Sequence, residues 1–400
     1  MLGAASVPIT TTRGLFVFPR FPYTRHRVTD ADIDAVNAVL TSGGPLTGGR
    51  EVEALEEELA VGGGYAVTAS SGTAALHLAA ESLSYVFGKP DLVLMPSFTF
   101  TATARVWLGL AKEVKFVDVD ESGLVQAWEL VRQAEYAMAA GKRVMIVTVD
   151  YAGQLCEYEQ LQKLRPYVRL LADSTHAIGA RRFGASVHSY VDAAVYSFHP
   201  AKHVAGGEGG ALWTGLKDVA DIARRLRSHG IVRTQLGKLY DVTIPGYNYR
   251  MPEITAALVR SQASRLAESL TQRRRIAAKY DSRLPWETSD KWVRALSVLK
   301  GNEHAYHLYP VTLSGYINRD RVQDLLSAAD IGTAVHYPPV HLLSWIRNQP
   351  AWATSGGLTG LRNTEALGRT VLSLPMYPEL EDKDVEYITE RLISAVEGKP

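Results

Sequence analysis

Residues 196–212 read YSFHPAKHVAGGEGGAL and place one lysine, Lys202, between an apolar run and a cluster of glycines. Residues 191–198 are mostly apolar and β-prone, which predicts a short buried strand that ends just before the lysine. Residues 211–214 predict another strand, and the glycines between them allow a tight turn or a close approach to a ligand. Lys202 is therefore expected at the mouth of a sheet, as a functional group or as a solvated loop residue.

The same strand pattern recurs over residues 50–215, where short apolar runs alternate with helical segments. The expected strands are Tyr65–Thr68, Leu92–Met95, Val114–Val119, Val144–Val149, Val168–Ala172 and Ala193–Phe198. This alternation predicts a mostly parallel sheet covered by helices. Ligands of such sheets bind at the carboxyl ends of the strands, so the residues that follow each strand are the candidates for function.

Helical periodicity predicts further helices on both sides of this region. One amphipathic helix should begin at a capping box at Thr29, and one long charged helix should run from Glu253 to about Arg283. The helix that begins at Thr29 should bury Ile33, Val36 and Leu40. Another helix is expected over residues 319–329. The last helix should bury Val385, Ile388, Leu392 and Val396. We predict an N-terminal arm over 1–28, a large domain over 29–252, and a connecting helix with a small α/β domain over 253–400.

Composition indicates a globular protein that binds small molecules. The 400 residues include 46% hydrophobic ones, which is ample for two buried cores. Lys and Arg number 43 against 42 Asp and Glu, so neither nucleic acid nor an anionic membrane is an expected partner. The single cysteine, Cys156, excludes an internal disulfide and fits a reducing compartment, so we expect the cytoplasm. We find no targeting signal and no membrane span in the sequence.

Two turns after predicted strands carry candidate ligand contacts. Ser71, Gly72 and Thr73 lead into a helix, where hydroxyls and free amides make an anion site that fits a phosphate, although simple helix capping by Ser or Thr gives the same pattern. Phe98 and Phe100 follow another strand, and either could stack on a flat aromatic ligand or belong to the core.

Asp173 ends an apolar strand, where a carboxylate needs a partner such as a cationic ring nitrogen, unless it only caps the next loop. Residues 246–251 and 335–339 follow later strands or precede a helix and are weaker candidates. His199 and His203 are four apart, but Pro200 and the glycines argue against a helical metal site, so no metal is expected. An esterase serine elbow and a dinucleotide fingerprint are both absent from residues 69–73.

A strand-end lysine, a phosphate cradle, an aromatic stacker and a strand-end aspartate are together the parts needed to hold pyridoxal 5′-phosphate. The lysine would form a Schiff base, the aspartate would keep the pyridine nitrogen protonated, and the helix terminus would bind the phosphate. Each signal has a structural alternative, but their combination favours this cofactor.

SFHPAKHVAGGEGGA also resembles the Schiff-base signature of the DegT-like (DegT/StrS-type) sugar aminotransferases. Further blocks resemble this family in the expected order over residues 27–396: SSGTAALHL, PSFTFTATA, VKFVDVD, DYAGQLCEYEQL, ADSTHAIGA, GYNYRMPEITAAL, AVHYPPVH and LSLPMYP. The resemblance implies an α/β protein of fold type I, similar to aspartate aminotransferase, with a mostly parallel seven-stranded sheet and a smaller C-terminal α/β domain. It also implies a pyridoxal-phosphate-dependent transaminase.

The resemblance assigns roles to individual residues. Lys202 would be the Schiff-base lysine and Asp173 the partner of the pyridine nitrogen, which makes these two the catalytic residues. The other residues expected at the cofactor are Ser71, Gly72, Thr73, Phe100, His176, Ser197 and Asn248, with His336 and Tyr337 expected at the substrate. Phe100 would stack on the ring, and His176 would lie against its other face or its hydroxyl. Asn248 would reach the phosphate of the neighbouring subunit, which implies a homodimer with shared sites.

Two blocks depart from the usual family pattern. Asp150 stands in place of the usual histidine of His-Tyr-Ala-Gly, and Ser174-Thr175 replace small residues before His176. Both lie near the expected pocket, so they bear on substrate choice more than on the cofactor. Lys202 is present where a related dehydratase branch has histidine, and this favours transamination.

The expected reaction moves an amino group from L-glutamate to a keto sugar on a nucleoside diphosphate, in two half-reactions through pyridoxamine phosphate. SFHPAK resembles members that aminate C4 slightly more than members that aminate C3. A cyclitol ketone is the alternative acceptor, and a regulatory protein that binds pyridoxal phosphate without turnover is a remote one. The sequence identifies neither the sugar nor the nucleotide.

Overall fold

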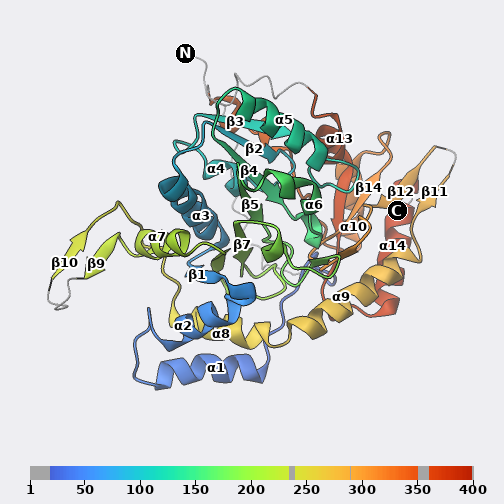
Figure 1. The fold of residues 1–400 in the computed structure, drawn as a ribbon. Helices are drawn as coiled ribbons and strands as arrows, with labels where there is room; N and C mark the ends of the chain where they lie inside the picture. The colour runs from blue at the N-terminus through green and yellow to red at the C-terminus, as the bar shows by residue number, and fades with distance from the viewer. Residues whose placement is uncertain (1–18, 234–238, 289, 350–359, 399–400) are drawn as a thin grey trace, which may run out of the picture.

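A computed structural model describes residues 19–233, 239–288, 290–349 and 360–398 of the chain. Its centre is a seven-stranded sheet in the order β1-β8-β7-β5-β4-β2-β3 (Figure 1). The strands are β1 (Tyr65–Ala69), β2 (Leu92–Pro96), β3 (Glu113–Val117), β4 (Val144–Val149), β5 (Arg169–Asp173), β7 (Ala193–Ser197) and β8 (Gly210–Thr214). Only β8 runs antiparallel to its neighbours in this sheet. The predicted α/β class and the mostly parallel sheet are confirmed.

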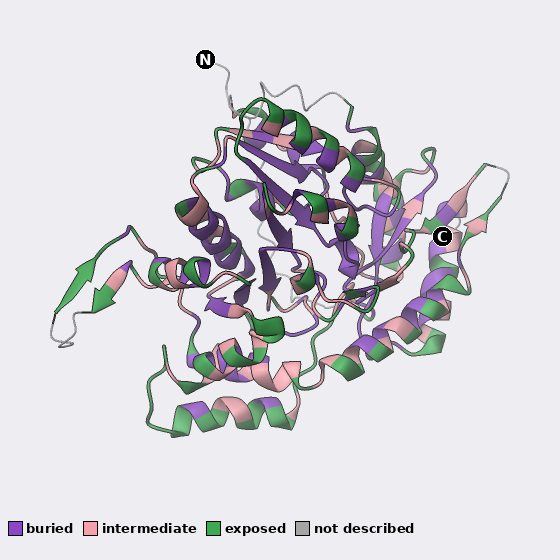
Figure 2. Cartoon of the chain, in the orientation of Figure 1, coloured by how far each residue is buried: buried purple, intermediate pink, exposed green. Residues whose placement is uncertain are grey.

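Helices cover both faces of this sheet because its strands present apolar side chains to both faces. In β5, Leu170 packs into the core on one face and Leu171 into the core on the other. The helices α3 (Gly72–Phe87) and α7 (Lys217–Arg227) cover one face, while α5 (Ala127–Ala139) and α6 (Tyr158–Leu161) cover the other. Figure 2 shows the resulting purple, fully buried strands between half-exposed helices.

A second, antiparallel sheet follows in the order β11-β12-β14-β15. Its strands are β11 (Trp286–Glu287), β12 (Trp292–Ala295), β14 (Tyr309–Leu313) and β15 (Val371–Leu374). The helices α9 (Leu266–Asp281), α10 (Arg319–Ala328) and α14 (Asp382–Glu397) share a core with this sheet, and α13 (Arg362–Thr370) contacts β14. The other helix of this part is α11 (Ser344–Arg347). The four apolar residues expected on one face of the last helix are all buried in α14, as predicted.

The remaining helices and strands lie outside these two sheets. They are α1 (Asp30–Thr41), α2 (Arg50–Leu59), α4 (Thr101–Arg105), α8 (Glu253–Ala263), the strand pair β6 (Arg181–Arg182) with β13 (Asn302–Glu303), and the hairpin β9 (Ile231–Arg233) with β10 (Tyr240–Val242). The hairpin projects away from the body of the chain (Figure 1). No helix in the described ranges is long and apolar enough to cross a membrane. The expected arm is described from Pro19, and residues 1–18 lie outside the described ranges.

Two helix predictions need correction. The single helix expected from Glu253 is two helices, α8 and α9, because Arg265 leaves the helical conformation with φ −106° and ψ 8°. Its guanidinium donates to both carboxylate oxygens of Asp32 and to the carbonyl of Ser261 in α8. The sequence pattern did not indicate these contacts.

The prediction of which residues the first helix buries is also wrong. Asp32 is the residue of α1 that is buried against α8, where Ser261 and Arg265 donate to its carboxylate. Ile33 and Leu40 are each more than half exposed and Val36 is half-buried, while the buried residues of α1 are Asp32 and Val39. The inward face therefore lies about one residue toward the N-terminus of the predicted one. The capping box at Thr29 and Asp32 is present as predicted.

Candidate active site

A cavity of about 410 Å³ lies at the carboxyl ends of the central strands and collects most of the predicted site residues. The predicted residues that line it are Ser71, Gly72, Thr73, Phe100, Asp173, Ser197, Lys202, His336 and Tyr337. Two of the predicted residues do not line it. His176 lies behind Tyr337, whose hydroxyl is 2.9 Å from His176 Nε2. Asn248 is exposed, in a β-bridge with Ser228.

Lys202 is held in a tight turn after β7. Its backbone N–H donates to the carbonyl of His199, and Gly206 N–H donates back to the carbonyl of Phe198, so the turn closes on the strand end. Burial lowers the pKa of the Lys202 amine to about 8, against the opposing effect of the Asp173 carboxylate. An amine with this pKa exchanges protons readily near neutral pH, which suits a group that carries protons.

Asp173 ends β5 as a buried carboxylate, 4% exposed, with hydroxyl donors on both oxygens. Thr103 Oγ1 donates to Oδ2 at 2.6 Å, and Thr175 Oγ1 donates to Oδ1 at 2.7 Å. A carboxylate oxygen has lone pairs for about two donors, so Oδ2, which accepts only from Thr103, keeps room for a further N–H. The side chain therefore fits a protonated ring nitrogen. The loop-capping contact that was the alternative is also present, because Thr175 N–H donates to Oδ1 at 3.2 Å.

The anion site predicted at the start of α3 is present. Ser71 caps the helix, since its Oγ accepts from Ala74 N–H at 3.1 Å, and the first amides of the helix have no partner within it. A Cβ on Gly72 would lie 2.8 Å from Ser197 Cβ and 3.0 Å from Ser197 Oγ. Only glycine lets the helix start approach Ser197 this closely, which leaves two hydroxyl groups and free amides around one small space that fits a phosphate.

Gly72→Ala is therefore expected to weaken the binding of pyridoxal phosphate by about tenfold to a hundredfold, because the new methyl group must push Ser197 away. The measurement is a titration of the cofactor-free protein followed by protein fluorescence. Gly315→Ala is the matched control, since a Cβ there meets no atom within 4 Å. Equal cofactor affinity in all three proteins would contradict the role of this turn.

The structure distinguishes the roles of Phe98 and Phe100, whereas the sequence allowed either residue to stack on a ligand or to belong to the core. Phe98 is fully buried in the core against Tyr151, with ring centroids 4.9 Å apart. Phe100 is 53% exposed and lines the cavity, with its ring 5.9 Å from that of Tyr337. Phe100 is thus the phenylalanine available to stack on a flat ligand.

His176 and Tyr337 form a polar pair at one wall of the cavity. Burial lowers the pKa of His176 well below its usual value, so the ring is neutral. Its Nδ1 accepts from Ala152 N–H at 3.3 Å, which leaves the proton on Nε2, the nitrogen next to the Tyr337 hydroxyl. Tyr337 can therefore accept from His176 and present its own O–H to the cavity.

The two departures from the family pattern meet behind the site. Ser174 Oγ donates to Asp150 Oδ2 at 2.5 Å, and Tyr158 Oη donates to Oδ1 at 2.8 Å. Asp150 N–H donates to the carbonyl of Asp173, so this group adjoins the strand end. Asp150 is fully buried, and the loss of hydration raises the pKa of its carboxyl to about 6.

This burial predicts a pH-dependent stability. The folded chain holds the Asp150 proton more tightly than the unfolded chain does. The stabilisation that this protonated carboxyl gives the folded state is therefore complete below about pH 4 and is lost as pH rises through about 6. Asp150→Asn stays neutral, so its free energy of unfolding relative to the parent should rise by about 2–3 kcal/mol between pH 4 and pH 8. Urea unfolding at several pH values measures this, with the exposed Asp218→Asn as control. A difference that does not change with pH would contradict it.

The structure adds residues that the sequence did not indicate. His307 lies with its Nε2 3.4 Å from Lys202 Nζ, and Thr103 and Thr175 hold Asp173. Tyr23, His199 and Glu208 also line the cavity. His307 falls in a stretch that reads as an ordinary strand entrance, so no local signal distinguishes it.

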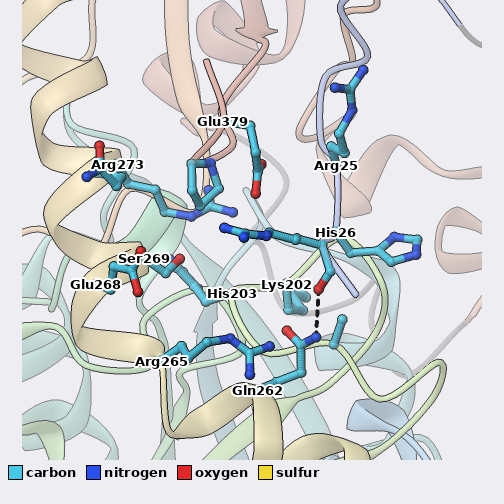
Figure 3. A pocket seen from close by; sticks show the side chains of 14 residues that line it. Arg25, His26, Lys202, His203, Gln262, Arg265, Glu268, Ser269, Arg273 and Glu379 are labelled. Carbon is cyan, nitrogen blue, oxygen red and sulfur yellow. Dashed lines mark hydrogen bonds between the residues drawn. The ribbon is translucent and has the colours of Figure 1, made fainter. Parts of the chain in front are cut away.

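A smaller pocket lies on the other side of Lys202 and is rich in cations. It is lined by Arg25, His26 and Arg27 of the arm, by His203, by Arg265 between α8 and α9, and by Arg273 of α9, together with Glu268 and Glu379 (Figure 3). Several of these cations already have partners: Arg265 pairs with Asp32, and Arg25 lies over the ring of Tyr377.

Comparison with known proteins identifies the family. The model of the DegT/DnrJ/EryC1/StrS aminotransferase family matches residues 26–393. The chain belongs to this family. The resemblance seen in its motifs is confirmed, and the chain is a pyridoxal-phosphate-dependent aminotransferase, whose cofactor fits the lysine, carboxylate and anion site described above.

Relatives in this family span almost the whole chain. A UDP-4-amino-4,6-dideoxy-N-acetyl-beta-L-altrosamine transaminase of Campylobacter jejuni is 30% identical over 381 residues, covering 94% of this chain and 97% of that protein. A UDP-4-amino-4-deoxy-L-arabinose–oxoglutarate aminotransferase of Shewanella sediminis is also 30% identical, covering 94% of this chain and 98% of that protein.

Solved structures of family members share the fold. PseC of Helicobacter pylori, an aminotransferase involved in the biosynthesis of pseudoaminic acid, superposes with a TM-score of 0.85 at 25% identity, covering 94% of this chain and 99% of that one. The putative sugar aminotransferase Spr1654 of Streptococcus pneumoniae, in its pyridoxamine phosphate form, gives 0.82 at 26% identity, covering 95% and 100%. The fold type I architecture predicted from the motifs is therefore confirmed.

Proposed function

We propose that this aminotransferase moves an amino group from L-glutamate to a 4-keto sugar carried on a nucleoside diphosphate, for the synthesis of an amino sugar. The observation that carries this proposal is similarity over the full chain to two transaminases whose names place the amino group at C4 of a UDP-linked sugar. The name of the second also contains oxoglutarate, the keto acid that glutamate becomes, which supports glutamate as the donor.

The side chains of the cavity divide the chemistry between them. Pyridoxal phosphate, when bound, supplies an aldehyde that joins to amines and a ring that accepts electrons. Lys202 Nζ removes a proton from the carbon that bears the substrate's amino group, and returns a proton in the second half-reaction. Asp173 holds a proton on the ring nitrogen, and Ser71, Gly72, Thr73 and Ser197 bind the phosphate. His336 and Tyr337 are proposed to contact the substrate, because both line the same cavity.

We also propose that two copies of the chain share their sites. Asn248 is exposed and does not line the cavity of its own chain, as expected of a residue that serves a partner's phosphate. Apolar side chains are exposed on α1 and on the β9–β10 hairpin, including Leu40, Val232 and Tyr240. A second copy that covers these side chains would remove apolar surface from water.

Mixing two inactive variants tests the sharing. Lys202→Ala and Asn248→Ala homodimers are each expected to lose activity, and a refolded mixture should regain part of it, because a hybrid dimer holds one site with both native residues. Sedimentation of the parent protein gives the oligomeric state independently. A monomer, or a mixture no more active than its components, would refute shared sites.

Two assays test the reaction itself. Addition of glutamate alone to the yellow, cofactor-loaded protein should bleach its visible absorption and release 2-oxoglutarate in a 1:1 ratio to protein chains, as expected when each site reacts once. A panel of 4-keto and 3-keto nucleotide sugars and cyclitol ketones should then restore the colour, with the 4-keto sugars fastest. Recovery with cyclitols only would select the alternative acceptor, and no response to glutamate would contradict the proposed donor.

We further propose the domain boundaries at residues 28 and 252, and a cytoplasmic location. The boundaries are supported by the two separate sheets, which lie within residues 65–214 and 286–374. The single cysteine, Cys156, is free and buried, which fits a reducing compartment.

A further inference from the structure

His307 is a buried histidine whose position is fixed by the backbone on both sides. Ala305 N–H donates to the carbonyl of Gly153 at 2.7 Å, and Leu308 N–H donates to the carbonyl of Ala152 at 3.2 Å. Arg273 Nη1 lies 3.4 Å from the carbonyl oxygen of His307 itself and donates to it. The imidazole is therefore placed by the sheet region and by α9 together, and not by a flexible loop.

The ring of His307 has one polar neighbour of note. Its Nε2 lies 3.4 Å from Lys202 Nζ, while its Nδ1 has no hydrogen-bond partner among the described residues. The rings of His176 and His203 pack on it, with centroid distances of 4.3 and 5.6 Å. Buried polar groups normally have a hydrogen-bond partner, and the partner of this ring is Lys202. The contact with the lysine is therefore the feature that a role for His307 must explain.

The surroundings of His307 keep its ring uncharged. Burial, with Lys202, His176, His203 and Arg273 as neighbouring cations or potential cations, lowers the pKa of His307 well below its usual value. The nearest carboxylates belong to other groups: Asp173 acts on Lys202, and Glu379 acts on Arg273. Figure 3 shows His203, Arg273 and Glu379 around the adjoining pocket. A neutral imidazole cannot compete with Lys202 for a proton, but it can accept a hydrogen bond.

Lys202 needs such an acceptor at one stage of its work. When Nζ carries the substrate proton it is an ammonium in a partly buried place, where an unpaired charge is costly. Within the described part of the chain no carboxylate forms an ion pair or a hydrogen bond with Nζ, and Asp173 acts on it only as a nearby charge. His307 Nε2 is the acceptor within reach.

We propose that His307 positions Lys202 by accepting a hydrogen bond at Nε2 from Nζ whenever the lysine is free and carries a proton. This inference rests on the proposed function, in which Lys202 is the proton carrier. It makes His307 a positioning residue, because it acts through the lysine and not on the substrate.

Three variants separate this role from packing. His307→Gln can place an amide oxygen near the native Nε2, His307→Asn is too short to reach Nζ, and His307→Phe keeps the ring without an acceptor. In protein loaded with pyridoxamine phosphate, which leaves Lys202 free, a ¹³Cε-lysine NMR titration reports the pKa of Lys202. We expect Asn and Phe to lower it by about one unit, and Gln to return it toward the parent value.

His304→Phe is the control for loss of a buried imidazole, since His304 stacks on Tyr306 and accepts from its N–H, with no contact to Lys202. Its Lys202 pKa should equal that of the parent. The acidic limb of the glutamate half-reaction should move to lower pH by the same amount as the NMR value in the Asn and Phe variants. An unchanged Lys202 pKa in His307→Asn, or equal shifts in Asn and Gln, would overturn the inference.

The same samples distinguish this inference from the proposed function. If the parent protein converts glutamate while the His307 variants leave the Lys202 pKa unchanged, the function stands and the positioning role fails. If the parent protein does not react with glutamate, the proposed donor fails whatever the NMR titration shows.

Discussion

Lys202→Ala is expected to lower the rate of amino transfer by about 10⁴-fold or more, while the variant still binds pyridoxamine phosphate. The physical reason is that in the proposed mechanism one amine serves as both base and acid, and no other group of the cavity is expected to replace it. His307 stays neutral beside it, and burial likewise lowers the pKa of His336, to about 4, so neither ring is an effective acid at neutral pH. A single-turnover measurement with glutamate gives the rate.

Two further variants show whether the loss comes from chemistry or from folding. Lys202→Arg keeps the length and the charge, but a guanidinium does not give up its proton at neutral pH, so the rate should stay as low as in Lys202→Ala. Added methylamine should restore part of the rate in the alanine variant only, since the small amine can enter the space that the side chain leaves. A Lys202→Ala protein with a rate within tenfold of the parent would refute the assignment.

The central sheet was predictable because its signals are local. Each parallel strand is a short apolar run buried on both faces, as Leu170 and Leu171 of β5 are, and such a run is visible in the sequence alone. The residues that follow these strands were predictable for the same reason. Lys202 and Asp173 stand where a strand ends, and the fold then brings all such ends to one edge.

What could not be predicted depends on contacts between distant segments. The break between α8 and α9 is fixed by Arg265 and Asp32, which are 233 residues apart. The pairing of Asp150 with Ser174 joins two departures that the sequence shows only as separate oddities. His307 reaches Lys202 from 105 residues away, from a segment that reads as an ordinary strand entrance. Periodicity carries no information on such pairs, because it reports only which face of an element is apolar.

Asp173→Asn is expected to slow amino transfer by about 10²–10³-fold with a smaller effect on cofactor binding. In the proposed mechanism this buried carboxylate is the negative charge that holds a proton on the ring nitrogen, and a neutral amide cannot do so. The hydroxyls of Thr103 and Thr175 can each reverse their hydrogen bond to suit an amide, so the side chain should keep its place.

The distinguishing measurement for Asp173→Asn is the isotope effect with glutamate deuterated at its α-carbon. If the carboxylate lowers the barrier to proton removal by Lys202, its loss makes that step more fully rate-limiting, and the isotope effect should rise. Thr175→Val is the matched control, because it removes one donor to Asp173 and keeps the charge; it should lose far less rate than Asp173→Asn. An Asp173→Asn protein that retains the parent rate and isotope effect would show that this carboxylate only caps its loop, the alternative that the Thr175 N–H contact represents.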